Sequence, residues 1–428
     1  MSDSDSLLLQ VTYREEADIA TFSNGDRTEV FRSGGSASGG PALGNDRNWD
    51  SAGNASGSVA TSETGQYSIE QLIRKLSFDW LAKGLCRGAW NGVAADEQGV
   101  DISFNDANNR AESVAADRYD SIEDRVGFPV VIEGSAANST LGNRLATLTD
   151  VGAGGSYAEL KGVVLANEAA GPNVRIRAGH GTIVGSQGGR TYYSLEEKVG
   201  IDGGAVSYEH FRGVVANSLG LANSTDGVLK ATWNLEYAKR LATTQATMGS
   251  GTVIADPGAG NSSFGFRKHL KMIQIDDGLL YAANDQASAT AIVLSAYDAA
   301  VETTDLVVQS HNWNVTNNIS RQGAGGDNLE AVDYNYGLHE VSGDISVLQR
   351  HKIKEWLQYW IEGGYPVSIK FYYEAGDGTG LIFFANKCLL SGGVPQVGTP
   401  GSPVTIPFSF RADADPLLGG RTWGMAIL

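Results

Sequence analysis

The stretch GVVANSLGLANSTDGVLKATWNLEYA, residues 213–238, predicts a β-hairpin and decides the fold class. Every other residue in its second half is apolar, namely Leu229, Ala231, Trp233, Leu235 and Tyr237. A period of two is typical of a strand that has one buried face and one solvent-exposed face. We therefore expect a protein built from β-sheets.

A second version of this hairpin, FFANKCLLSGGVPQVGTPGSPVTIPFSFRAD, lies at residues 383–413. Its last strand alternates in the same way, and Pro407 on the polar face indicates an edge or a bulge. RTYYSLEEK at 190–198 parallels PVSIKFYYE at 366–374, so each version has three strands. The matching apolar rows are Val215, Asn217, Leu219 and Leu221 against Phe384, Asn386, Cys388 and Leu390, then Trp233 and its neighbours against Val404, Ile406, Phe408, Phe410 and Ala412.

Upstream of each three-strand group the apolar period changes to 3.6, which predicts a helix at 68–84 and another at 346–364. Gly84 is a plausible end of the first helix, and Gly363 with Gly364 ends the second. A short strand precedes each helix, at 55–60 and 341–346. The stripes are Ile69, Leu72, Ile73, Leu76 and Trp80 in the first helix, and Ile353, Trp356, Leu357, Trp360 and Ile361 in the second.

The first strands also correspond, because LLLQVTY at 7–13 resembles LVVQSHNWNV at 306–315. Each is followed by a polar loop, at 19–53 and at 320–337. The same order of elements thus occurs at 1–240 and 305–428, which indicates an internal duplication. Residues 98–188 predict a small inserted β module, and 241–304 form a linker that contains an apolar segment of unassigned role.

The composition restricts the function. The chain has 428 residues, is 42% hydrophobic and carries a formal net charge of −17. An acidic surface repels phosphates, so we expect no tight nucleic-acid binding. The two cysteines, Cys86 and Cys388, form no disulfide or metal pattern, and no apolar run is long enough for a membrane helix.

No catalytic constellation is present in the sequence. It lacks GxxxxGK[ST], HExxH, GxSxG and CxxC motifs, and its six histidines are scattered. The GDGTG stretch at 376–380 lies between two strands, which favours a hairpin turn over a phosphate loop. We expect no enzyme activity, no catalytic residue, no cofactor and no metal site.

Three stretches together resemble the tail tube proteins of long-tailed bacteriophages, in the two-copy form. They are EHFRGVVANSLGLANSTDGVLKATWNLEYA at 209–238, GSVATSETGQYSIEQLI at 57–73 and the closing KCLLSGGVPQVGTPGSPVTIPFSFRADADPLLG. The strand motif of that family corresponds to Phe211, Gly213, Asn217, Ser218, Leu219 and Trp233, with Asn386 and Phe408 in the second copy.

The resemblance implies a mainly β fold, a β-sandwich or barrel with a flanking helix. It further implies a structural virion protein, made in the bacterial cytoplasm, whose rings stack into the channel for phage DNA. With two copies per chain, a homotrimer would make a pseudo-six-fold ring. The implied partners are other copies of the chain, the tape measure, tail terminator and tip proteins, and DNA in transit; no membrane insertion is implied.

The two long polar loops are expected to dock onto the adjacent ring, as they do in that family. Deleting residues 34–48 is then expected to leave a folded subunit that does not polymerise.

The alternatives to a tail tube function are another β-rich tail or capsid component, such as a terminator or decoration protein, and a carbohydrate- or host-binding role for the inserted module. The candidate ring-stacking residues are Gly34, Gly35, Asp46, Arg47, Trp49, Arg321, Asp327, Asn328 and Glu330.

Overall fold

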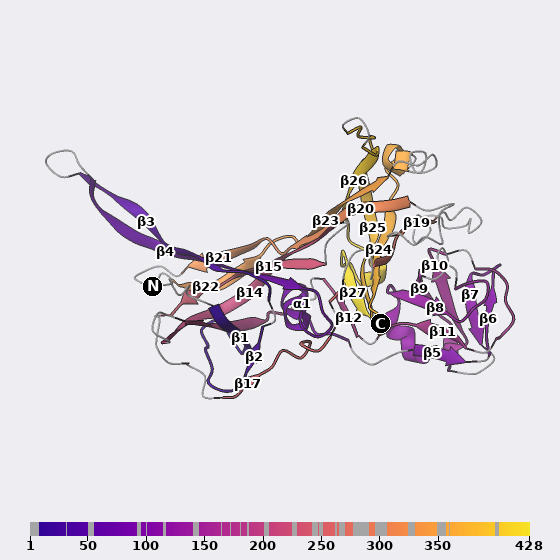
Figure 1. Ribbon diagram of the computed structural model, residues 1–428, viewed down its shortest axis with the longest axis horizontal. Helices are drawn as coiled ribbons and strands as arrows, with labels where there is room; N and C mark the ends of the chain where they lie inside the picture. The colour runs from indigo at the N-terminus through magenta and orange to yellow at the C-terminus, as the bar shows by residue number, and fades with distance from the viewer. Residues whose placement is uncertain are drawn as a thin grey trace.

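In the computed structural model, six antiparallel strands of the N-terminal half pair in a fixed order (Figure 1). We call this the first unit. In β15 and the last part of β4, buried residues alternate with more exposed ones, which places a core on one side of the sheet. In pairing order they are β1 (Leu8–Glu16), β13 (Tyr192–Gly200), β14 (Val206–Ser224), β15 (Lys230–Glu236), β4 (Ala55–Leu72) and β3 (Ala37–Trp49).

The C-terminal half repeats this pairing order in what we call the second unit. The prediction of a mainly β fold is therefore confirmed. The corresponding strands are β18 (Leu270–Asp276), β24 (Val367–Glu374), β25 (Gly380–Gly392), β26 (Thr405–Ala412), β23 (Glu340–Leu348) and β20 (Leu306–Thr316).

The structure describes residues 8–30, 32–49, 55–91, 96–99, 101–113, 117–139, 145–163, 165–171, 173–179, 181–185, 188–200, 205–224, 229–241, 247, 251–261, 263–264, 270–276, 291–295, 306–323, 330–348, 357–358, 360–398 and 402–428. The remaining elements are β2 (Arg27–Glu29), α1 (Asp79–Cys86), β16 (Lys239–Arg240), β17 (Val253–Ile254), β19 (Ala291–Ser295), β21 (Ile319–Gly323), β22 (Ala331–Tyr336), β12 (Gly181–Val184), β27 (Gly424–Ile427), a 3-10 turn at Pro416–Leu418 and those of the inserted module.

The counterpart of β1 is β18, and not residues 306–315 as the sequence predicts. β1 pairs with β13, and β18 pairs in the same antiparallel sense with β24. Residues 306–315 instead form β20, which pairs with β23. The likeness of the two apolar stretches reflects the common strand pattern, and the segment without an assigned role, 270–276, supplies the missing strand.

The prediction of a helix over 68–84 is wrong in its first half. β4 continues to Leu72 because its last seven residues pair with β15, with Ile69 opposite Trp233. Tyr67, Ile69 and Gln71 are buried while Gln66 and Glu70 are exposed, which is a period of two that the apolar stripe concealed. The helix is α1, and it buries Trp80, Leu81 and Leu85 in the core.

In the second unit, residues 357–358 and 360–363 are helical and Gly364 follows with a φ of 61°. This agrees with the predicted end of the helix. Its predicted start falls on β23, which runs to Leu348, and residues 349–356 lie outside the described part of the chain.

The two predicted polar loops contain β-hairpins. β3 and β4 pair from Ala37 opposite Tyr67 out to Trp49 opposite Ala55, and this hairpin projects away from the rest of the molecule (Figure 1). In the second unit, β21 and β22 form a shorter hairpin. Polar, glycine-rich sequence had concealed the strands, because their apolar alternation is weak.

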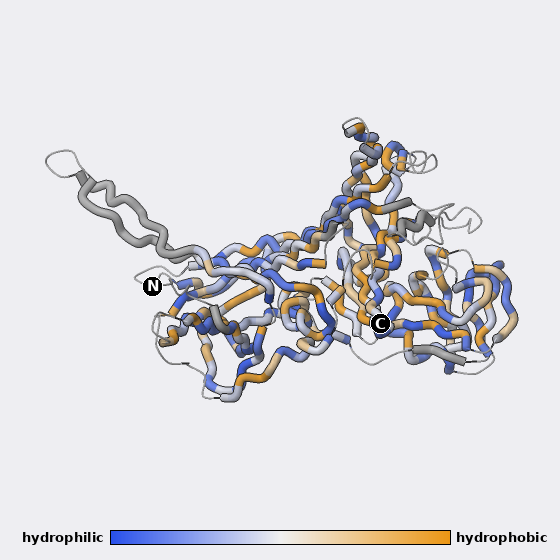
Figure 2. The backbone as a smooth tube through the Cα atoms, viewed as in Figure 1, coloured by the Kyte–Doolittle hydropathy of each residue, from blue (hydrophilic) through white to orange (hydrophobic). Residues whose placement is uncertain are grey.

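The inserted module is a separate seven-stranded sheet with its own hydrophobic core. Figure 2 shows hydrophobic and hydrophilic residues interspersed along its strands, as they are in the two units. The predicted last part, β12, pairs instead with β27 near the C-terminus. The module's elements are β5 (Asp96–Gly99), β6 (Ile102–Asn105), β7 (Arg110–Ser113), a 3-10 helix (Asp120–Arg125), β8 (Pro129–Glu133), β9 (Leu145–Val151), a 3-10 turn (Ala153–Gly155), β10 (Tyr157–Lys161) and β11 (Val174–Arg177).

The module is inserted into the sequence of the first unit but packs on the second unit (Figure 1). Its Phe128 lies 5.4 Å from Phe384 of β25, ring centroid to centroid. Gln274 of β18 donates a hydrogen bond to the Gly162 carbonyl. The full apolar contact consists of Phe128, Val131 and Leu145 against Met272, Tyr372, Ile382, Phe384, Leu418, Ala426 and Leu428.

Candidate functional site

The two units share one sheet, because β14 of the first unit pairs with β20 of the second. Residues 218–224 lie opposite 310–316 in antiparallel register. The result is a run of eight strands, β3–β4–β15–β14–β20–β23–β26–β25. Its core side carries Trp233, Trp313 and Phe408, and a single hydrophobic core spans both units.

The other face of this sheet carries small polar side chains, and we call it the polar face. Asp344 accepts hydrogen bonds from Asn312 and Ser409, and Asn234 donates to Ser218, so neighbouring strands are linked across it. By register the face includes Ser36, Ser38, Gln66, Ser68, Glu70, Leu72, Lys230, Thr232, Asn234, Ser218, Gly220, Ala222, Ser310, Asn312, Asn314, Thr316, Glu340, Ser342, Asp344, Ser346, Leu348, Thr405, Pro407, Ser409, Arg411, Leu389 and Ser391.

Charges on the polar face are few and of both signs. Glu70, Glu340 and Asp344 oppose Lys230 and Arg411, and Arg411 lies 3.6 Å from Glu340. The face therefore has a small net negative charge and no cluster of cations. Two other acidic residues lie at the ends of these strands: Glu236 is buried and Asp413 is half-buried.

The first and last strands of the eight-strand run have free edges within the described part of the chain. β3 pairs with β4 on one side only. After Cys388, β25 and the residues that follow it pair with β26 alone, through Gly392 opposite Phe408 and Gln396 opposite Thr405. Unpaired edges are the places where another sheet can add.

The junction between the two units is held by more than the β14–β20 ladder. The β21–β22 hairpin lies over the first unit, where Tyr334 donates a hydrogen bond to the Gly213 carbonyl at 2.8 Å. The Ile319 amide donates to the Asn217 side chain at 3.0 Å, and Arg321 donates to the Ala238 carbonyl at 2.6 Å. A small apolar cluster of Tyr192, Val215, Ala238, Ala331 and Tyr334 fills the space between them.

A cluster of ion pairs links the two units at one side of this junction. Glu330, at the start of the hairpin, accepts hydrogen bonds from Arg212 and Lys239 of the first unit. Partial burial tends to raise the pKa of Glu330, but these two hydrogen bonds outweigh it and lower that pKa. Arg190 and Asp333 form a second pair at 2.5 Å across the same junction.

His339 links three elements on the other side of the junction. Its Nδ1 lies 2.6 Å from Asn317 Oδ1, and its Nε2 accepts a hydrogen bond from Trp423 at 2.5 Å. Asn317 in turn donates to the carbonyls of Leu85 and Ala216. Burial, aided by nearby Arg87, lowers the pKa of His339 to about 4. The neutral ring with its proton on Nδ1 is the form that satisfies both partners.

The predicted strand-motif residues are mostly core residues. Phe211, Leu219, Trp233 and Phe408 are fully buried in the common core. Gly213 has a φ of 60°, and a Cβ there would lie 2.6 to 2.7 Å from Ile19 and Ala238, so glycine is required.

The two asparagines that align in sequence lie at different bulges. Asn217 interrupts the β14–β15 ladder, whereas Asn386 lies at the irregularity between β24 and β25. Asn386 is buried and donates to the Gly127 carbonyl and to Asp415, on the side of the inserted module. The two residues therefore serve different contacts.

The candidate stacking residues lie in four different places. Gly34 and Gly35 lie beside β4 at the base of the long hairpin, where a Cβ on Gly35 would lie 2.1 Å from the Ser68 carbonyl oxygen. Arg321 and Glu330 lie at the junction inside the chain. Asp46, Arg47 and Trp49 fall within β3, and Asp327 and Asn328 lie outside the described residues.

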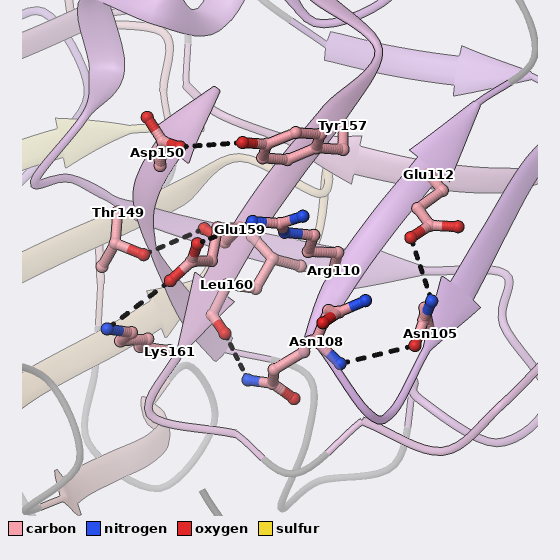
Figure 3. Close-up of polar contacts among 11 residues, drawn as sticks. Asn105, Asn108, Arg110, Glu112, Thr149, Asp150, Tyr157, Glu159, Leu160 and Lys161 are labelled. Carbon is pink, nitrogen blue, oxygen red and sulfur yellow. Dashed lines mark hydrogen bonds and ion pairs between the residues drawn. The ribbon is translucent and has the colours of Figure 1, made fainter. Parts of the chain in front are cut away.

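The solvent side of the module sheet carries mutually paired polar groups (Figure 3). Glu159 lies 3.5 Å from both Arg110 and Lys161, and Tyr157 donates to Asp150 at 3.2 Å. The Arg110 guanidinium stacks 3.8 Å from the Tyr157 ring centroid. These contacts satisfy the charged groups locally.

The described residues hold neither a metal cluster nor a membrane helix. No three or more His, Cys, Asp or Glu side chains among them gather closely enough to hold a metal ion. Among the helices in the described segments, none has the length and apolar character needed to cross a membrane.

Sequence reasoning missed Asn317, His339 and β18, which have no counterpart motif. Only the unexplained apolar stretch at 270–276 gave a signal. The contacts of Asn317 and His339 depend on how the two units meet, which a strand pattern does not encode.

The shared sheet has one polar face and two edges that are free within the described part of the chain, and such edges are where another sheet can add. Residues 9–412 match the family described as phage tail tube protein, and the chain belongs to that family. It is therefore a structural component of a phage tail. A comparison with curated protein sequences finds no match.

Proposed function

We propose that three copies of this protein close into a ring, with the eight-strand sheet of each forming one third of the channel wall. The observation that supports this is the continuous sheet with a free edge at each end. A closed barrel removes such edges, and cyclic symmetry follows when the head-to-tail contact closes. The repeated strand order supports the view that the two units are copies, so the ring would be pseudo-six-fold.

The dimensions are compatible with DNA passage. About 24 strands spaced by about 4.8 Å and tilted by about 40° enclose a backbone diameter of about 50 Å. A channel of that width accommodates a DNA duplex together with its hydration layer. Half as many strands would leave a channel about half as wide.

The polar face is the surface that we assign to the channel. Small Ser, Thr and Asn side chains offer weak hydrogen bonds to phosphates, and the few charges are of both signs. A cationic wall would hold DNA through counterion release, whereas this face exerts little attraction. Weak contact with the channel wall favours sliding of DNA through the channel.

The β3–β4 hairpin is the element that we propose for stacking of one ring on the next. Its far end, which includes Asp46, Arg47 and Trp49, extends beyond the body of the molecule (Figure 1). Contacts with the tape measure, terminator and tip proteins would occur within or at the ends of such a tube.

Electron microscopy of the purified full-length protein tests the proposal. We expect rings or hollow filaments with an open centre, and three chains per ring by native mass spectrometry. A monomer that stays dispersed at high concentration and shows no ring or filament would contradict it. A variant lacking residues 46–57 loses the far end of the hairpin but keeps the paired strands at its base, and it is expected to give single rings that do not stack.

A further inference from the structure

The two units of one chain already meet in a contact that a ring would need six times. We infer that the contact between neighbouring chains repeats the β14–β20 junction, with the free edge of β3 pairing with residues 391–397 of the next molecule. This inference rests on the proposed ring. Its partner is a second copy of the same chain.

The correspondence of β3 with β20 follows from the ladders. Ile69 of β4 lies opposite Trp233, as Ile345 of β23 lies opposite Phe408. Counting outward from these pairs, Ala37 of β3 takes the place of Trp313 of β20. β3 pairs with β4, and β20 pairs with β23. On its other side β20 pairs with β14, whereas the other edge of β3 is unpaired within the described part of the chain.

The correspondence of β14 with β25 follows in the same way. Leu219 lies opposite Trp233, and Gly392 lies opposite Phe408. Counting from Gly392, residues 218–221, which receive β20, correspond to 391–394; the ladder then shifts by one residue, because Gln396 lies opposite Thr405 and so takes the place of Ala222. Since Leu221 faces Trp313 in the junction, Val394 is expected to face Ala37 of the next chain.

The exposure of apolar side chains supports this arrangement. Leu221 is 0% exposed under β20, whereas its counterpart Val394 is 71% exposed. Val215 is 1% exposed under the β21–β22 hairpin, and its counterpart Leu389 is 43% exposed. The second unit thus presents apolar positions that the first unit covers with its neighbour.

The two edges also lack the usual protection against pairing. Proteins commonly place charged residues along free edges to prevent sheet addition. Residues 33–38 read SGGSAS and 391–397 read SGGVPQV, without a charge in either. Pro395 supplies no N–H, which is compatible with a position at the edge of a sheet.

The geometry gives the long hairpin a second role. β20 enters the junction and leads directly into the β21–β22 hairpin, which covers Val215. β3 would enter the equivalent junction of the next molecule and lead into the β3–β4 hairpin. The part of β3 after residue 40 would then cover Leu389, so this hairpin joins neighbours within a ring before its tip reaches the next one.

Disulfide trapping tests the register. The double variant Ala37→Cys/Val394→Cys, oxidised after assembly, is expected to give covalent dimers and trimers on a denaturing gel. Each single variant controls for other contacts, because the native Cys86 and Cys388 are buried. The pair Ala222→Cys/Asn312→Cys copies the junction inside the chain and is expected to cross-link without any dimer.

A charge substitution tests the contact without a cross-link. Val394→Asp is expected to raise the protein concentration needed for ring formation by at least about tenfold, because pairing would bury the carboxylate. Val253→Asp changes a valine that is 46% exposed in the first unit and is expected to assemble normally. Circular dichroism checks that both variants fold.

The outcomes separate the inference from the proposed function. Rings that form normally, yet give no covalent dimer in the double-cysteine variant and no response to Val394→Asp, would overturn the inference and leave the channel proposal intact. Absence of rings in the unmodified protein would overturn both. Covalent trimers from assembled rings would support both.

Discussion

At the scale of single residues, the protein depends on a few positions that only one side chain can fill. Gly213 combines a φ of 60° with close approach to Ile19 and Ala238. It lies where β14 passes from pairing with β13 to pairing with β15, and its carbonyl receives the Tyr334 hydroxyl. This glycine therefore affects the first unit and the junction together.

Replacing Gly213 with alanine is expected to lower the free energy of unfolding by about 2 to 4 kcal/mol, because backbone strain and steric contact add. Gly220 of the same strand is the matched control, since the nearest atom to an added Cβ is 3.5 Å away. Urea denaturation of the two variants gives the comparison. Equal stability of both would show that the bend at 213 is not constrained.

The buried histidine at the junction predicts a pH dependence. The pKa of His339 is lowered to about 4, so between pH 6.5 and 4 the unfolded chain binds a proton that the folded chain does not. Stability is therefore expected to fall on acidification through this range, by up to about 3 kcal/mol from this group. His311, whose burial lowers its pKa to about 3, adds to the same trend.

The His339→Gln variant isolates the contribution of the junction. Glutamine retains a donor and an acceptor but does not titrate, so its unfolding free energy is expected to decline less steeply from about pH 6.5 to about 4.5. Unfolding curves at several pH values check this. Parallel declines in both proteins would assign the acid sensitivity to other groups.

At the scale of elements, the inserted module is part of the second unit's structure. Phe128 packs against Phe384, and Arg177 of β11 donates to the Gly378 carbonyl in the turn before β25. Removing the module would expose Met272, Tyr372 and Ile382. A module so attached holds a fixed orientation on the second unit.

Phe128→Ala is expected to loosen this attachment while the module keeps its own core. Truncation of a buried phenylalanine costs about 3 to 5 kcal/mol. Hydrogen exchange should then accelerate in β8 and β24 but remain slow in β6 and β10. Phe104→Ala, in the module's own core, is the contrasting variant and should destabilise β6, β7 and β10. Uniform acceleration in both variants would indicate that the module and the second unit unfold together.

The elements also show which parts of the fold the sequence could predict. The strands at 213–238 and 383–413 were predictable because one face of each is buried and alternation is regular. The structure of residues 68–84 was not predictable in this way. Ile69 and Ile73 fit both the helical period of 3.6 and the strand period of two, and pairing with β15 makes the first part of this stretch a strand. The β3–β4 hairpin gave no apolar signal, and the β14–β20 junction depends on contacts between distant segments.

At the scale of the whole molecule, the free edges and the net charge of −17 act in opposite directions. Bringing three such chains together increases electrostatic repulsion, while edge pairing and burial of Val394 favour association. Salt screens the repulsion over about 8 to 10 Å at moderate ionic strength.

Assembly is therefore expected to strengthen as salt increases. Raising sodium chloride from about 20 mM to about 300 mM should lower the concentration at which rings form, since screening weakens long-range repulsion more than local contacts. Light scattering across a concentration series measures this. Dissolution of rings by salt would instead indicate that ion pairs between chains drive assembly.

The most direct test of the account is a cryo-electron microscopy map of the assembled tube at a resolution that separates strands. The account predicts three chains per ring, a continuous wall in which β3 of one chain lies beside residues 391–397 of the next, and the face bearing Lys230, Asp344 and Arg411 lining the channel. A ring of six chains, or a wall whose channel surface comes from other strands, would contradict it.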